Sequence, residues 1–140
     1  MRNKNLKILG TIIGIILIIP ATVSADSNYF SSVQQICSAY QLSLNYDNMN
    51  LRTLADGSEE LTINLESARN QFDRVMLIGF YAAGKAMVYH SKPIEKVTVV
   101  ISVAYKGVEN IVANASRENI MKFVNGEISS SEFVRKVKFD

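Results

Sequence analysis

The sequence predicts an α+β fold: a two-layer sandwich in which a four-stranded antiparallel sheet, made of two hairpins, carries a long central helix and short terminal helices. Two pairs of β-rich segments are each joined by a short turn, one containing Gly57 and one containing Gly107. Residues 68–90 lack proline and place apolar side chains at helical spacing. Each hairpin precedes a helical segment, an order typical of helices packed on one face of an antiparallel sheet.

The first 25 residues have the organisation of a secretory signal peptide. Arg2, Lys4 and Lys7 form a basic start without an acidic residue, and the uncharged apolar stretch 8–19 follows them. Small residues after Pro20 complete the order of basic start, apolar core and cleavage site that defines such a signal.

The small residues also locate the expected cleavage. Val23 and Ala25 stand at the positions that a signal peptidase recognises, which predicts a cut between Ala25 and Asp26. We therefore expect a signal peptide at 1–25 and a single domain at 26–140 that is extracytoplasmic, either secreted or periplasmic and cell-surface. Because an apolar stretch continued to Ala25 approaches the roughly 20 residues of a membrane span, an uncleaved anchor is the alternative.

Charge argues against a nucleic-acid partner. The chain has 15 basic and 13 acidic residues, but the three bases of the signal leave with it, so the remaining domain has 12 and 13 and a net charge near −1. A near-neutral domain without a basic stripe lacks the phosphate neutralisation that supplies most nucleic-acid affinity. The expected partner is an unknown protein or a second copy of the chain, and the membrane only where the signal is kept as an anchor.

The first half of the domain begins with a predicted helix at 27–42, where apolar residues recur every three or four positions. A strand at 45–54 and an alternating strand at 59–65 follow, joined by an Asp-Gly turn at 56–57 that tolerates positive φ. These two strands form the first expected hairpin.

A long helix is predicted at 68–90, with Ser67 as its cap. It is apolar nearly all round between 75 and 84, which predicts a buried central helix packed on the sheet and covered on its back. The competing interpretation, a second membrane span at 75–89, is opposed by its short length and by Lys85.

The second half contains the clearest strand, at 96–105, where Val97, Val99, Ile101, Val103 and Tyr105 occupy alternate positions. A Lys-Gly turn leads to a partner strand at 108–114. Ser116 is the expected cap of a short helix at 117–124 that Gly126 ends, and Ser129 with Glu132 forms a capping box for a last helix.

The residues that catalysis and metal binding need are scarce. His90 is the only histidine and Cys37 the only cysteine, so a Ser-His-Asp or Cys-His arrangement would have to use His90, and no zinc ligand set is present in the sequence. His90 at a helix C-terminus suits the helix dipole, and Cys37 suits a small buried position. We therefore expect no catalytic residue, no cofactor and no metal site. We also expect that the protein is not an enzyme.

The predicted function is an exported binding module that recognises a partner protein or itself. Its alternative is an extracytoplasmic carrier or sensor of a small apolar ligand held between helix and sheet. Either role would use small and flexible residues on one face of the long helix: Met76, Gly79, Ala83 and Met87. Asn114 is the acceptor of an Asn-Ala-Ser sequon that we expect to be exposed between a strand and a helix, which makes it a candidate glycosylation site.

Overall fold

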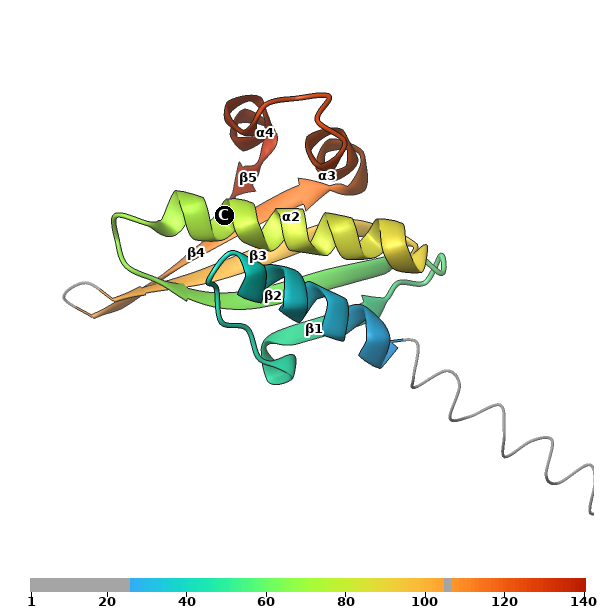
Figure 1. Cartoon of the computed structure of the whole chain (residues 1–140), viewed down its shortest axis with the longest axis horizontal. Coiled ribbons are helices and arrows are strands. Elements are labelled where there is room, and N and C mark those ends of the chain that lie inside the picture. Colours follow the sequence, from blue (N-terminus) through green and yellow to red (C-terminus); the bar gives the residue numbers. More distant parts are fainter. Residues whose placement is uncertain (1–25, 105–106) are drawn as a thin grey trace, which may run out of the picture.

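A computed structural model describes residues 26–104 and 107–140, in which four helices pack on a five-stranded sheet (Figure 1). The α+β class and the central helix agree with the sequence prediction. The predicted signal at 1–25 lies outside the described residues.

The sheet is mixed, with the strand order β1-β2-β3-β4-β5. Both predicted hairpins are present, because β1 pairs antiparallel with β2 and β3 pairs antiparallel with β4. The prediction of a purely antiparallel sheet is wrong, since β2 and β3 are parallel and a short fifth strand adds to the edge of β4. The strands are β1 (Met49–Thr53), β2 (Glu59–Ser67), β3 (Ile94–Ala104), β4 (Val108–Ser116) and β5 (Lys138–Phe139).

The length of the central helix explains the parallel pair. Helix α2 (Phe72–His90) has 19 residues and is therefore about 28 Å long. Strand β2 has nine residues and is about 30 Å long. A helix of that length carries the chain back to the end of the sheet where β2 began, so β3 starts there and runs in the same direction, as in a βαβ unit.

Three other α-helices and one 3-10 turn accompany α2 in the described residues. The N-terminal helix is helical over residues 26–39, a 3-10 turn η1 (Tyr46–Asn48) precedes β1, and the chain ends with α3 (Arg117–Val124), α4 (Ser130–Lys136) and β5. The N-terminal helix lies beside α2 over β1 and β2, whereas α3 and α4 lie towards β4 and β5 (Figure 1).

Two predicted caps are confirmed and one is wrong. The Ser116 hydroxyl accepts from the backbone N–H of Asn119, and the Ser129 hydroxyl from that of Glu132. Ser67, expected to cap the long helix, is instead the last residue of β2, because that strand continues two residues beyond the expected end. Helix α2 therefore begins only at Phe72, without a side-chain cap.

The two faces of the sheet differ. On the covered face, under the helices, the side chains are buried and apolar: Leu61, Ile63 and Leu65 of β2, Val97, Val99, Ile101 and Val103 of β3, and Ala113 and Ala115 of β4. The alternate residues form the open face, which none of the described helices covers and which is mainly polar, for example at Thr62, Thr98 and Asn114. The domain is thus two layers thick, with its core between sheet and helices.

Glycines allow α2 close contact on two sides. A Cβ at Gly79 would lie 3.0 Å from a Leu65 methyl, on the sheet. A Cβ at Gly84 would lie 2.5 Å from Val124 and 2.6 Å from Ile120, on α3. Within the described part of the chain, no helix combines the length and the apolar character needed to cross a membrane.

Candidate functional site

A shallow aromatic groove lies between the N-terminal helix and α2. Two adjoining hollows of about 310 and 410 Å³ share Gln35, Ile36 and Tyr89 and so form one continuous surface. We call this surface the aromatic groove. Its lining is Ser32, Gln35, Ile36, Ala39 and Tyr40 from the N-terminal helix, and Tyr81, Lys85, Tyr89 and His90 from α2.

The groove exists because the back of α2 is only partly covered. Tyr81, Lys85 and Tyr89 recur every four residues and form one stripe of the helix. Towards the C-terminal end of α2 this stripe reaches solvent, where Tyr89 is 79% exposed and its neighbour Val88 56% exposed. The expected cover on the back of the helix is therefore incomplete at this end.

Aromatic rings pack against one another at the base of the groove. The rings of Tyr40 and Tyr81 meet edge to face with centroids 5.8 Å apart, and Tyr81 makes a similar contact with Phe123 of α3 at 6.1 Å. Repulsion from the neighbouring Tyr81 phenol is the main cause that raises the pKa of Tyr40. The ammonium of Lys85 lies 6.0 Å from the Tyr81 ring centroid, at the outer limit of a cation–π contact.

One end of the groove is closed by a polar contact between the two helices. The Ser32 hydroxyl and His90 Nε2 are 2.8 Å apart, and the His90 ring meets Tyr29 edge to face. His90 is the last residue of α2, as expected. Its position joins two helices whose contact residues are 58 positions apart in sequence.

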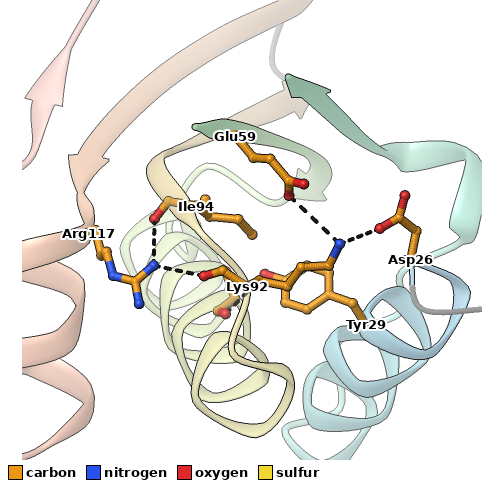
Figure 2. A network of polar contacts seen from close by, with 7 residues as sticks. Asp26, Tyr29, Glu59, Lys92, Ile94 and Arg117 are labelled. Atoms are coloured by element: carbon orange, nitrogen blue, oxygen red, sulfur yellow. Dashed lines mark hydrogen bonds and ion pairs between the residues drawn. The ribbon is translucent and has the colours of Figure 1, made fainter. Parts of the chain in front are cut away.

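An ion cluster lies at the same end of the molecule (Figure 2). The Lys92 ammonium pairs with the Asp26 carboxylate and lies 3.8 Å from Glu59 Oε2. Beside it the Arg117 guanidinium donates to the carbonyl oxygens of Lys92 and Ile94, at 2.7 and 3.4 Å. We call Asp26, Glu59 and Lys92 the ion cluster.

Tyr29 forms the apolar wall next to the ion cluster. It is fully buried, and its hydroxyl donates to the carbonyl oxygen of Ala83 at 3.1 Å. Burial raises the pKa of Tyr29 well above its usual value, and the negative charge of Glu59 adds to the effect. The cluster therefore lies at the boundary between the core and solvent.

A third hollow, of about 520 Å³, lies at the edge formed by β4, β5 and α3. Its charged side chains are Lys96, Lys136 and Lys138 together with Glu95 and Asp140. Opposite charges are interspersed at this open edge, so the hollow presents no single sign that would select an ion.

Asn114 also lines this hollow, and its exposure differs from our expectation. It lies within β4, half-buried, where its side chain accepts from Thr98 at 2.6 Å and donates to Asp140 at 2.8 Å. The expected exposed connection is wrong because β4 extends to Ser116. Glycosylation of Asn114 stays a prediction.

The four α2 residues that the sequence predicted as a ligand or dimer contact lie together, but they lie in the interior of the domain. Met76, Gly79, Ala83 and Met87 are all buried, and Gly79 contacts the sheet directly. The three hollows described above are lined by other residues. A ligand or dimer contact through these four residues, and with it the carrier function, stays a prediction.

The sequence analysis also considered Cys37, metal-ligating residue types and the predicted cleavage position. Cys37 is buried, and burial raises the pKa of its thiol to about 11. Within 26–104 and 107–140, no three His, Cys, Asp or Glu side chains gather where they could hold a metal ion. At the predicted cleavage position, Ala25 lies outside the described residues and Asp26 is the first of them.

Sequence reasoning missed the groove, although one signal was present. Between residues 75 and 89, where the helix is otherwise apolar, Tyr81, Lys85 and Tyr89 mark a single amphipathic stripe. Comparisons of the chain with protein-family models, with curated proteins and with solved structures found no significant match.

Proposed function

We propose that the chain is an exported, non-enzymatic module that binds a segment of another protein in the aromatic groove. The observation that carries the proposal is the exposure of large side chains along this surface: Tyr89 is 79% and Tyr40 45% exposed. Their grouping between two helices distinguishes them from single exposed apolar residues, which need no explanation.

The groove has the composition of a recognition surface. Tyrosine offers a large apolar ring with few rotatable bonds and a polar tip, and it is enriched where proteins contact one another. Two neighbouring helices with an apolar floor are a common receptor for an amphipathic helix, which inserts side chains spaced three and four residues apart. We therefore expect the bound segment to be helical and to present apolar anchors.

The charge of the groove lining indicates which residue types the bound segment should carry. Lys85 is the only Lys or Arg in the lining, which holds no Asp or Glu. Within the described part of the chain, no carboxylate forms an ion pair with Lys85. A carboxylate on the bound segment would supply that missing partner and set its orientation.

The same charge argues against a second copy of this chain. In a two-fold symmetric contact the same patch serves both subunits. Two such grooves facing each other would bring two Lys85 ammonium groups together without a lining carboxylate between them. The proposal therefore commits to a different protein that carries an acidic, apolar segment.

A photo-crosslinking amino acid at position 89 tests the proposal in the cells that make the protein. We expect a discrete crosslinked product with a second protein. Position 108 is the matched control, because Val108 is 74% exposed but lies outside the groove. The captured partner is then measured against purified variants, where Lys85→Glu should weaken binding at least about tenfold and Lys136→Glu should leave it nearly unchanged.

Three results would contradict the proposal. Equal crosslinking from positions 89 and 108 would show that the groove is not selective. A product of exactly two copies of this chain would show self-association in its place. Unchanged affinity of the Lys85→Glu variant would show that the bound segment does not pair an acidic residue with Lys85.

A further inference from the structure

The ion cluster is short of one positive charge. It contains one ammonium, from Lys92, and two carboxylates, from Asp26 and Glu59 (Figure 2). The Lys92 and Glu59 side chains are only 12% and 19% exposed, so water screens them poorly, whereas the Asp26 side chain is 54% exposed. The Arg117 guanidinium lies beside the cluster, but it donates to backbone carbonyl oxygens and forms no ion pair with Asp26 or Glu59 among the described residues. The buried Glu59 carboxylate is therefore only partly compensated, which is unfavourable.

One carboxylate oxygen in the cluster also lacks a donor. Glu59 Oε2 is buried and accepts no hydrogen bond among the described residues. The nearest cation, Lys92 Nζ, is 3.8 Å away, which is close enough for an ion pair but too far for a hydrogen bond. Buried carboxylate oxygens are normally hydrogen-bonded, so this oxygen indicates a missing donor.

The missing cation and the missing donor coincide with the predicted cleavage position. Asp26 lies in the cluster and is also the residue expected to begin the mature chain. Hydrolysis of the Ala25–Asp26 peptide bond by a signal peptidase adds one water molecule, which leaves a carboxylate on Ala25 and an ammonium on Asp26. The new ammonium is a cation with N–H donors, created beside the cluster.

We propose that the chain is cleaved between Ala25 and Asp26 and that the freed α-ammonium docks in the ion cluster, with the Glu59 carboxylate as its receptor. Two ammonium groups then face two carboxylates, and the charges balance. The carboxylates also offset the unfavourable approach of a positive charge to a helix N-terminus. Cleavage thereby completes the ion cluster and attaches the N-terminal helix to β2.

The docked ammonium predicts how stability depends on pH. The titratable and charged groups in and around the cluster are Asp26 and Tyr29 of the N-terminal helix, Glu59 of β2, His90 and Lys92 at the end of α2, and Arg117 of α3. An α-ammonium held by carboxylates has a higher pKa in the folded chain than in the unfolded chain, where it is about 8. Its stabilisation is therefore complete below about pH 8 and is lost as pH rises through the folded value.

Two forms of residues 26–140 test the proposal. The first begins with a free Asp26 ammonium, produced by a protease that leaves no extra residue, and the second keeps Ser24 and Ala25 in front of it. At pH 7 we expect the free form to melt about 3–6 °C higher. The difference should shrink as pH rises from 8 to 10. Equal melting temperatures at pH 7 would overturn the proposal.

Matched variants assign the effect to Glu59. Glu59→Gln should abolish the difference between the two forms, whereas Glu60→Gln should keep it. Glu60 is the adjacent acid on the open face, where it pairs with Arg52. A difference retained in full by Glu59→Gln would overturn the assignment. If that variant does not fold, the pH dependence of the unmodified pair decides, because a difference that persists to pH 10 does not come from an α-ammonium.

The processing step has its own readout. The intact mass of the protein recovered from its exporting cells should correspond to a chain that begins at Asp26. A mass that retains residues 1–25 would overturn the proposal.

Discussion

The covered and open faces of the sheet are held together in different ways. On β3 the covered residues Val97, Val99, Ile101 and Val103 are nearly inaccessible to solvent and pack under α2 and α3. On the open face the strands are linked by polar pairs, such as Thr98 with Asn114 at 2.6 Å and Ser102 with Asn110 at 2.9 Å. Burial makes the larger contribution per residue, because exposed polar pairs exchange with water at little net gain.

Removing a buried side chain from the helices that cover the sheet should lower the stability of the protein the most. Phe133 of α4 is fully buried, stacks on Phe123 at 4.6 Å and meets Phe80 edge to face at 5.4 Å. We expect Phe133→Ala to lower the free energy of unfolding by about 3–5 kcal/mol, measured by urea denaturation. Phe139→Ala, at a residue that is 49% exposed, is the control and should cost clearly less. Equal losses would show that α4 does not contribute its burial to the core.

The same substitution on adjacent residues compares the faces directly. Val99 is fully buried on the covered face, whereas Val100 is half-buried on the open face. Val99→Thr places a hydroxyl in the core and should cost about 1–3 kcal/mol, but Val100→Thr should stay within about 0.5 kcal/mol of the unmodified protein. Similar values for both variants would mean that something covers the open face in solution.

A smaller effect is expected from the polar links of the open face. Asn114 joins Thr98 on β3 to Asp140 after β5. Asn114→Ala should cost about 1 kcal/mol in the same urea experiment. Asn110→Ala removes a single exposed contact and should cost less. A loss as large as that of Phe133→Ala would contradict the difference between the faces.

An effect confined to high pH is expected at Cys37 of the helix layer. Burial raises the pKa of this thiol to about 11 in the folded chain, above its value in the unfolded chain. The corresponding stability is fully present below the unfolded pKa and is lost as pH rises through the folded value. Between pH 8.5 and 11, the unmodified protein should therefore lose more stability than Cys37→Ala. Parallel pH profiles would show that the thiol titrates normally.

Local patterns predicted the parts of the fold that depend on neighbours in sequence. Alternation in β3 marked the residues of its covered face, and Ser116 and Ser129 capped the expected helices because a cap needs only the next three residues. The two residues of β5 were missed because a strand so short leaves no periodic signal.

Features that depend on distant partners were not predictable in the same way. The parallel pairing of β2 with β3 follows from the point at which α2 returns the chain to the sheet. The residues of the turns carry no information about that point. Likewise the aromatic groove needs Tyr40 and Tyr81 side by side, and the ion cluster needs Asp26 beside Lys92. In each case the residues are tens of positions apart, so only the folded arrangement brings them together.

The contact between Tyr29 and Ala83 joins residues 54 positions apart, which has a consequence for the order of folding. In a chain that is translocated from its N-terminus, Tyr29 emerges long before the helix that buries it. The N-terminal helix would then wait with its apolar side uncovered until α2 has also emerged. A factor that shields this segment during translocation would therefore act before the first hairpin is complete.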